Sequence, residues 1–434
     1  MRVADSIETI VERGLCTGCG ACESLLGKDV LRMGLSPEGF MRPRGQRPLR
    51  NDEQKAVMQV CAGRSQAGLA TGEAAPHHIF GTMLHLAKGH ATAPEIRFRS
   101  ATGGVLTALA VYLVESGKVG GILQVCVSAD NPLLNEARLN TTREQIVASS
   151  GSRYGPSAPL RDIGALLDSG RRFAFIGKPC DVATLRNLAR VDPRVDLQVP
   201  YMLAMVCGGN PSVAATYNIV RRFGEDHRDV EEFRYRGHGW PGPTYLRTKQ
   251  GREHSQTYDE TWFSNLTYEL MFRCKICADG TGEHADVVAG DCWVMDGGKP
   301  SHREAGDGWN MHIARTERGR QLIEDAVVAG YIHEEAFSVA ELEAMHDDHG
   351  AKKRSVLWRL AGLALTGQPY PDYGALRVVR SGLAASWRER WTAFRGTLAR
   401  SLKRRNRESP ITSGNFVPDT PVISGTFVPD TKTS

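Results

Sequence analysis

The sequence lacks any apolar run long enough to cross a bilayer, and its first thirty residues lack the apolar core of a signal peptide. It also lacks an excess of charge of one sign, because 54 lysine and arginine residues stand against 49 acidic residues, a formal net charge of +5. Such a balance is not that of a chain that binds nucleic acid along its whole surface. We therefore expect a cytoplasmic protein with no nucleic-acid partner, attached at most peripherally to the inner face of a membrane.

Disulfides are not expected in that compartment, so the ten cysteines are available as ligands. Cys16, Cys19 and Cys22 are each separated by two residues. This spacing suits one cubane 4Fe–4S cluster, and Gly18 and Gly20 permit the tight turns that such a loop needs. The motif therefore predicts a small iron–sulfur module at the start of the chain.

The fourth cysteine of a bacterial ferredoxin run, which precedes a proline, is missing from this motif, and Leu25 and Leu26 stand in that region. The nearest other thiol is Cys61, which we predict to be the fourth ligand. A zinc site remains an alternative, because zinc also accepts four cysteine ligands.

Expected strands and helices alternate after residue 96. Apolar runs predict buried strands over residues 121–127, 173–176, 201–206, 285–293 and 308–315, with helices over 105–113, 182–188, 213–223 and 319–329. The alternation predicts an α/β layer structure with mostly parallel strand pairing, in a chain of mixed α/β class.

Two of these strands lead into a cysteine, Cys180 and Cys207, and a later Cys-X-X-Cys supplies Cys274 and Cys277. Since parallel strands present their chemistry at their carboxyl ends, we expect these four thiols to form a second ligand set. Cys292 is a spare candidate. Cys126 lies inside a strand and is expected to be a small buried side chain.

Five segments are predicted along the chain. They are an N-terminal ferredoxin-like iron–sulfur module (1–65), an α/β domain (77–190), a domain with the Cys-X-X-Cys (191–345), a basic helical extension (346–408) and a disordered tail (409–434). The tail repeats one short motif, at 413–420 and again at 424–431, as a docking peptide could.

The expected helix that begins at Leu383 has apolar residues every three or four positions and arginines on its other face. Between Trp387 and Arg407 eight residues are basic and Glu389 alone is acidic. The helix over 383–407 is open to three interpretations. Its apolar face packs on the protein itself, on a partner protein, or on an anionic membrane surface.

As a set and in this order, the motifs resemble the beta-subunit family of coenzyme F420-reducing hydrogenases and F420-linked dehydrogenases, which includes a hydroxymethyl-chlorophyll reductase. The resemblance covers roughly residues 10–330. The matching segments are Cys16–Cys22, Ser100–Gly104, Gly151–Tyr154, Gly177–Cys180, Cys207-Gly208, Cys274–Asp279 and Gly290–Trp293.

The resemblance implies FAD and one or two 4Fe–4S clusters, in an α/β flavin domain that follows the iron–sulfur module. It also implies positive charge from Lys178 near the flavin ring, which makes Lys178 the one candidate catalytic residue. The residues that it would place around the flavin are Thr102, Gly103, Gly104, Ser152, Tyr154, Lys178, Asp291 and Asn310.

We therefore expect a flavin- and iron–sulfur-dependent oxidoreductase that works in an oligomer. A hydride or electron pair would be exchanged at FAD, and single electrons would pass through the clusters to a ferredoxin or another subunit. Whether the hydride partner is coenzyme F420, a nicotinamide or neither stays open. The alternatives are a passive electron-transfer subunit without a substrate pocket, and a zinc-stabilised interaction scaffold at a membrane-associated assembly.

Overall fold

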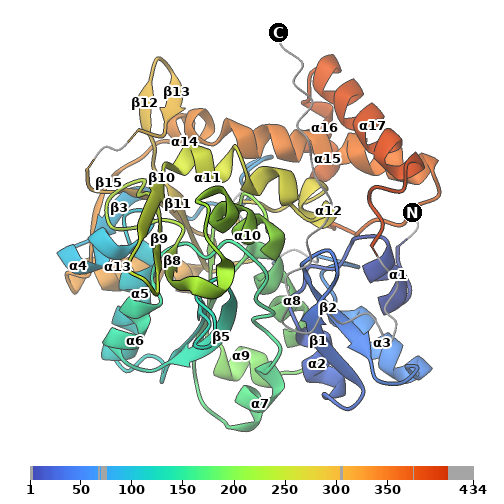
Figure 1. Ribbon diagram of the computed structural model, residues 1–434, viewed down its shortest axis with the longest axis horizontal. Coiled ribbons are helices and arrows are strands. Elements are labelled where there is room, and N and C mark those ends of the chain that lie inside the picture. The colour runs from blue at the N-terminus through green and yellow to red at the C-terminus, as the bar shows by residue number, and fades with distance from the viewer. Residues whose placement is uncertain (1–2, 67–68, 70–75, 304–305, 375, 409–434) are drawn as a thin grey trace.

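The computed structural model describes residues 3–66, 69, 76–303, 306–374 and 376–408, and the repeated tail lies outside them. Its centre is an eight-stranded sheet in the order β15-β3-β14-β11-β7-β6-β4-β5 (Figure 1). The strands are β3 (His85–Ala91), β4 (Ile122–Val127), β5 (Asn135–Asn140), β6 (Ala174–Gly177), β7 (Tyr201–Met205), β11 (Val287–Asp291), β14 (Asn310–Ala314) and β15 (Ile332–Ala336).

The prediction of mostly parallel pairing was wrong. Only the central strands β4, β6, β7 and β11 pair in parallel, and the pairs on both sides of them are antiparallel. The connection from β4 to β5 is a short loop, and a short loop can join only antiparallel neighbours. The predicted strands themselves are confirmed, and the sheet is mixed rather than parallel.

Helices cover both faces of this sheet, so its central strands are buried on both sides. Val287 and Ala289 of β11 pack in one core with α5 (Val105–Glu115) and α13 (Glu317–Val328). Val288, which points the other way, packs in the second core with α8 (Pro179–Ala189) and α14 (Val339–Met345). The remaining helices around the sheet are α4 (Pro94–Arg99), α6 (Arg143–Ala148), α7 (Ile163–Asp168) and α9 (Arg194–Gln198).

A smaller antiparallel sheet, β10-β9-β8, stands beside the main one. Its strands are β8 (Val230–Arg234), β9 (Thr244–Thr248) and β10 (Glu253–Gln256), with α10 (Val213–Arg222), α11 (Tyr258–Trp262) and the short α12 (Phe272–Lys275) nearby. A hairpin of β12 (Val294–Asp296) and β13 (Lys299–Ser301) follows β11.

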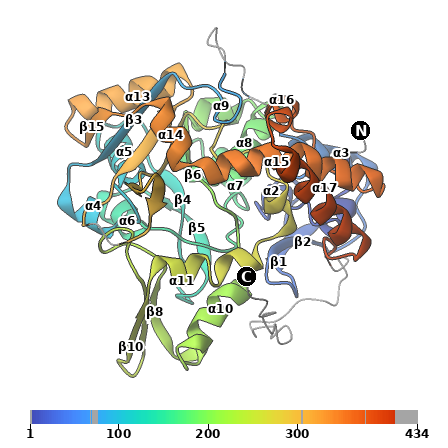
Figure 2. The same ribbon diagram turned by 90° about the horizontal axis from the view of Figure 1, so that it is seen from above.

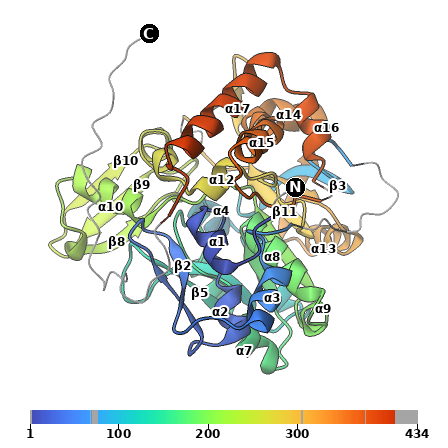
Figure 3. The same cartoon turned by 90° about the vertical axis from the view of Figure 1, so that its right-hand side faces the viewer.

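The N-terminal segment is built from short helices and one hairpin. It contains α1 (Ile7–Glu12), α2 (Ala21–Leu26), a hairpin of β1 (Leu31–Leu35) and β2 (Met41–Gly45), and α3 (Asn51–Val60). Figure 3 shows this segment below the C-terminal helices and beside α8. Cys19, Ala21 and Val60 belong to the core of the main sheet, whereas Ile7, Ile10 and Leu15 pack in another cluster with Phe272 and Leu363.

The C-terminal extension consists of α15 (Asp347–Leu365), α16 (Val378–Leu383) and α17 (Trp387–Leu402). The single helix predicted from Leu383 was wrong, because α16 ends there and Ser386 caps a new helix, its hydroxyl accepting from the Glu389 amide. In Figure 2 α15 runs along the top of the molecule with α17 beside it. No helix among the described residues is both long and apolar enough to span a membrane.

Of the three interpretations of this helix, packing on the protein itself holds for one side of α17, which packs on α15 through small residues. Ala393, Thr397 and Ser401 are buried, and Gly362 of α15 lets the backbones approach closely. Trp387 and Trp391 are instead 73% and 52% exposed. The helix therefore shows aromatic and basic side chains together on its outer side.

Candidate functional site

A cavity opens at the carboxyl edge of the parallel strands, where an α/β sheet usually binds its ligand. It encloses about 1290 Å³ with its open mouth included, and its walls come from the ends of β4, β6, β7 and β11 and the start of α5. Seven of the eight predicted flavin residues line it: Thr102, Gly104, Ser152, Tyr154, Lys178, Asp291 and Asn310.

The eighth, Gly103, lies behind this wall and holds the turn against the sheet. A Cβ on Gly103 would lie 2.7 Å from the Asn310 nitrogen and 2.8 Å from the Gly89 carbonyl oxygen. Its amide donates to the Thr102 hydroxyl, which in turn donates to the Trp309 carbonyl at 2.7 Å. Glycine is thus required here by the close approach of the backbone to two strands.

Asn310 ties the start of α5 to the sheet. Its side-chain oxygen accepts from the Val105 amide at 3.0 Å, and its side-chain nitrogen donates to the Gly290 carbonyl at 2.8 Å. The amides of Leu106 and Thr107, in the same first turn, have no intrahelical acceptor and lie at the cavity wall. A helix start of this kind is suited to bind an anion such as phosphate.

Sequence reasoning missed Arg236, which forms a bidentate ion pair with Asp291 at the cavity wall. The two bonds measure 2.6 and 3.0 Å, and the guanidinium lies over the rings of Tyr258 and Trp293. Asp291 is therefore already paired with a cation. The only local signal was the glycine-rich stretch that follows Arg236.

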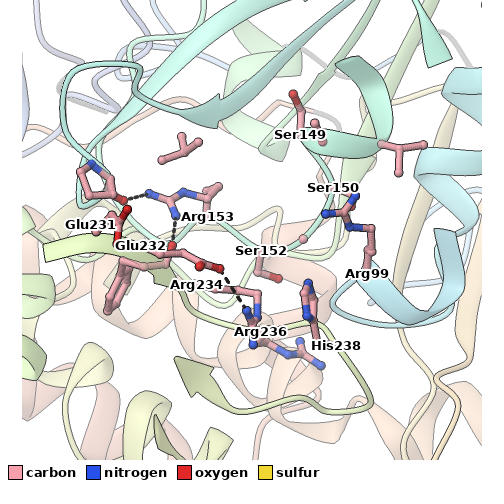
Figure 4. Close-up of a pocket in the computed structure, with 16 residues that line it drawn as sticks. Arg99, Ser149, Ser150, Ser152, Arg153, Glu231, Glu232, Arg234, Arg236 and His238 are labelled. Atoms are coloured by element: carbon pink, nitrogen blue, oxygen red, sulfur yellow. Dashed lines mark hydrogen bonds and ion pairs between the residues drawn. The ribbon is translucent and has the colours of Figure 1, made fainter. Parts of the chain in front are cut away.

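A second cavity of about 850 Å³ adjoins the first and shares Ser149–Arg153 and Arg236 with it. Figure 4 shows Arg99, Arg234 and His238 around it. Burial, followed by the charges of Arg234 and Arg99, lowers the pKa of His238. Arg153 is committed to structure, because it donates to the carbonyls of Pro132, Leu134 and Phe233. Glu231 and Glu232 line it as well, and Arg234 lies 3.6 Å from the Glu232 carboxylate. The mouth of the main cavity is thus bordered by an annex with more basic than acidic side chains.

Lys178 lies at the start of α8, with its Nζ 2.7 Å from Asp181. Burial alone would lower the pKa of Lys178, but the Asp181 carboxylate and then the Cys180 thiol raise it overall. The side chain is therefore a cation at neutral pH, with part of its charge balanced by Asp181. It lies between the cavity and the second set of cysteines.

The structure brings the four cysteines of the second set together. Burial and the nearby Cys274 raise the pKa of Cys207 to about 12, and Cys277 adds to this effect. Burial, with Cys207 and Cys274 among the contributing charges, likewise raises the pKa of Cys180. The Asn210 amide donates to Cys274 Sγ at 3.3 Å. Cys207 also lines the main cavity, so this set shares a wall with it.

The first set is also assembled, from Cys16, Cys19, Cys22 and Cys61. Burial and the charges of Cys19, Cys16 and Cys61 raise the pKa of Cys22, and similar causes raise the pKa of Cys61 to about 12. Gly18 and Gly20 have φ of +73° and +90°, as a tight loop requires. Two of these four thiols are buried and two are partly buried, and thiols that oppose one another's ionisation need a cation to hold them as thiolates.

The spacing of the sulfurs helps to choose between zinc and a cluster. Among the described residues, the groups of three or more His, Cys, Asp or Glu side chains whose ligand atoms all lie within 4.8 Å contain no cysteine. Zinc–sulfur bonds of about 2.3 Å would bring tetrahedral ligands to about 3.8 Å of one another. In neither cysteine set do three sulfurs therefore lie as close together as the ligands of one zinc ion would.

Arg273 and α8 connect the two sets. Arg273 precedes Cys274, and its guanidinium donates to the carbonyl of Ala62, next to Cys61, at 3.4 Å. Burial raises the pKa of Cys19, and the negative charge of Asp181, the residue that follows Cys180, raises it further. The order in space is thus cavity, second set, first set.

The remaining two cysteines lie apart from these sets. Cys126 is buried in β4, as predicted, and its thiol contacts the Glu136 carbonyl. Cys292 has Lys88 and Glu341 as its charged neighbours and none of the eight cysteines of the two sets.

Comparison with known proteins agrees with this architecture. Residues 86–163 match the amino-terminal part of the family described as coenzyme F420 hydrogenase/dehydrogenase, beta subunit, and residues 170–339 match the carboxyl-terminal part of the same family. The two matches cover more than half of the chain. They include the second cysteine set, whereas the first set and the C-terminal extension lie outside them.

Individual relatives carry the same names. The coenzyme F420 hydrogenase subunit beta of Methanococcus voltae is 25% identical over 265 residues, 58% of this chain and 84% of that protein. The F420-dependent formate dehydrogenase 1 subunit beta of Methanococcus maripaludis is 27% identical over 263 residues, and the match spans 62% of that protein. A chain of the F420-reducing [NiFe] hydrogenase complex from Methanosarcina barkeri superimposes with a TM-score of 0.48 at 21% identity, over 65% of this chain and 96% of that one.

The class that these comparisons define is that of oxidoreductase subunits that transfer electrons. Within this class, the chain belongs to the coenzyme F420 hydrogenase/dehydrogenase beta-subunit family.

Proposed function

We propose that the chain is a flavin- and iron–sulfur-dependent oxidoreductase subunit, which exchanges a hydride or an electron pair at FAD and passes single electrons through two 4Fe–4S clusters to a partner protein. The observation that carries this proposal is the shared wall between the main cavity and the second cysteine set, formed by Cys207 and Lys178. Bound FAD would supply the conversion between two-electron and one-electron chemistry.

The cavity residues have separate tasks in this proposal. The amides of Leu106 and Thr107 would bind a phosphate of the cofactor, and Asn310 holds that helix start in place. Lys178 would place a positive charge beside the ring, where negative charge develops on reduction. Tyr154, which contacts the rings of Tyr235 and Trp262, would form an apolar wall that excludes water.

The cysteines would hold the clusters in a row leading away from the cavity. Cys180, Cys207, Cys274 and Cys277 would bind the nearer cluster, and Cys16, Cys19, Cys22 and Cys61 the farther one. The farther cluster would be the port to a ferredoxin or another subunit, because it is the one that does not border the main cavity. Arg273, between the two sets, would balance the negative charge of the thiolates.

The hydride partner that we propose is a deazaflavin of the coenzyme F420 type, since the relatives bear that name. Arg99 in the annex would suit an anionic part of either the flavin or this partner. In the relatives the beta chain is one subunit of an enzyme, and we propose the same for this chain.

We also propose that the outer surface of α17 makes a peripheral contact with the cytoplasmic side of an anionic membrane. Trp387, Trp391 and Leu402 are exposed there among arginines and a lysine, a composition suited to the interface of a bilayer. This contact would hold the protein near a membrane without a spanning segment.

Anaerobic purification followed by a visible spectrum and by iron, sulfide and flavin analysis tests the proposal. We expect one FAD and about eight irons per chain, as two cubanes require. About four irons would leave one cysteine set unused. Clusters without flavin would favour the passive electron-transfer subunit, and a colourless protein with zinc would favour the scaffold.

A further inference from the structure

Three side chains from adjacent strands meet on one face of the main sheet, away from both cysteine sets. His312 of β14 lies opposite Ala87 of β3, and Glu334 of β15 lies opposite Gly89. Because residues two apart on a strand point to the same face, His85 of β3 shares that face with both of them. The two flanking strands thus direct a histidine and a glutamate toward each other across β3.

The small residues of β3 make this meeting possible. Ala87 and Gly89 leave the space above the middle strand free for the longer side chains of its neighbours. A Cβ on Gly89 would lie only 3.1 Å from Cε1 of the His312 ring. A larger residue at either position would push the imidazole away from the carboxylate.

The polar atoms converge on one point. Nε2 of His85 lies 3.0 Å from Oε1 of Glu334, and Nε2 of His312 contacts the same oxygen. All three atoms lie within 4.8 Å of one another. Nδ1 of His312 has no hydrogen-bond partner, so Nε2 is the nitrogen through which this buried ring acts. Both imidazole nitrogens approach the same carboxylate oxygen of Glu334, rather than one oxygen each. The three ligand atoms therefore surround a common centre.

We propose that His85, His312 and Glu334 bind a divalent cation of the zinc class. Two imidazole nitrogens and one carboxylate oxygen are a ligand set that zinc uses, with the fourth position left to water. Magnesium and calcium are less suitable, because they prefer sites built from oxygen ligands alone. His312 is buried, whereas His85 and Glu334 are partly exposed, so an ion has a path from solvent.

The position of this site indicates what the ion would do. It would join β3, β14 and β15, the three antiparallel strands at one side of the sheet. Asn310, which holds the start of α5, lies two residues before His312 on β14. The cation would therefore fasten the strand that supports the floor of the main cavity, and it would take no part in electron transfer.

Zinc uptake by the full chain tests the proposal. Anaerobically purified protein is dialysed to equilibrium against Zn²⁺, and zinc and iron per chain are measured together. The wild type is expected to hold one more zinc per chain than His312→Ala and Glu334→Gln, with the same iron content. His333→Ala is the matched control, because His333 is the preceding residue of β15, points to the opposite face and should leave zinc unchanged.

Equal zinc in the wild type and in Glu334→Gln would overturn the proposal. Glu334→Gln is nearly isosteric, so it decides the matter even if His312→Ala does not fold. Equal uptake of Mg²⁺ and Zn²⁺ at this site would overturn the assignment to the zinc class. Since zinc is counted directly, these results do not depend on whether FAD or the clusters are present.

Discussion

At the scale of single residues, the site is built from side chains whose partners lie far away in the sequence. Asn310 connects α5 to β11, and Arg236, in the segment between β8 and β9, neutralises Asp291. Neither side chain is free to act as a general acid or base. Their contribution is to hold a cavity wall in one shape, so that a ligand meets an arrangement that is already formed.

Replacing Cys274 by serine should remove the iron of one cluster and leave the other, since serine does not supply a thiolate. Iron per chain should fall by about four, which anaerobic iron analysis measures. Cys126→Ser is the control, because Cys126 is a buried strand residue outside both sets. Unchanged iron in Cys274→Ser would contradict the second ligand set.

Asn310→Ala should weaken both the fold and flavin binding. It leaves the buried Val105 amide and Gly290 carbonyl without their partner, which costs about 1–3 kcal/mol of unfolding free energy. Denaturant unfolding measures this loss, and flavin per chain measures the effect on the cavity. A variant that retains full flavin would show that the helix start does not support the cofactor.

At the scale of elements, α17 shows how packing can reverse an expectation from periodicity. Large apolar residues at helical spacing usually mark the buried face. Here a Cβ on Gly362 would lie 3.0 Å from the Phe394 carbonyl oxygen, so the two helices are too close for tryptophans between them. Small residues fill the contact, and the tryptophans are left on the outside.

Replacing Trp387 and Trp391 by serine should reduce binding to anionic vesicles, because both rings would be buried at the headgroup level. Co-sedimentation with phosphatidylglycerol vesicles and with neutral phosphatidylcholine vesicles measures this. Phe263→Ser with Tyr268→Ser is the control, since these two exposed aromatic residues lie far from the extension in sequence. If the wild-type protein binds neither type of vesicle, the membrane contact is refuted. The exposed face of α17 would then be assigned to contact with a partner protein.

At the scale of the whole molecule, the N-terminal segment and the end of the C-terminal extension are in direct contact. Arg42 of β2 and Glu408 form a buried ion pair at 2.5 Å, and the Arg42 charge also acts on Cys16. The Glu408 amide donates to the Glu12 carbonyl of α1. The C-terminal extension therefore packs against the segment that carries the first cysteine set, and both lie outside the family match.

Glu408→Ala should destabilise the protein by about 3–5 kcal/mol, because it leaves the Arg42 guanidinium buried and unpaired. Asp168→Ala, which breaks the exposed pair with Arg194, should change stability by less than about 1 kcal/mol. Thermal unfolding of the two variants gives the comparison. Similar melting temperatures for both would show that the contact between the ends contributes little.

The local motifs were predicted well, and the long-range pairings were not. The tight turns within Cys16–Cys22, the start of α5 at Val105 and most strands follow from spacing and apolar runs. The antiparallel edges of the sheet, the Arg236–Asp291 pair and the meeting of His85 with Glu334 had no local signal. Each depends on how distant strands are ordered, which a run of neighbouring residues does not encode.

By itself, the amino-acid sequence determined the positions of the thiols, the glycines that let the backbone turn around them, and the alternation of strands and helices, because these are properties of short segments. Only the tertiary structure decided that Cys207 borders the cavity, that the two cysteine sets lie in a row, and which face of α17 is buried. The physical reason is that such contacts depend on the closest approach of surfaces that are far apart along the chain, and that approach is set by the packing of the whole core.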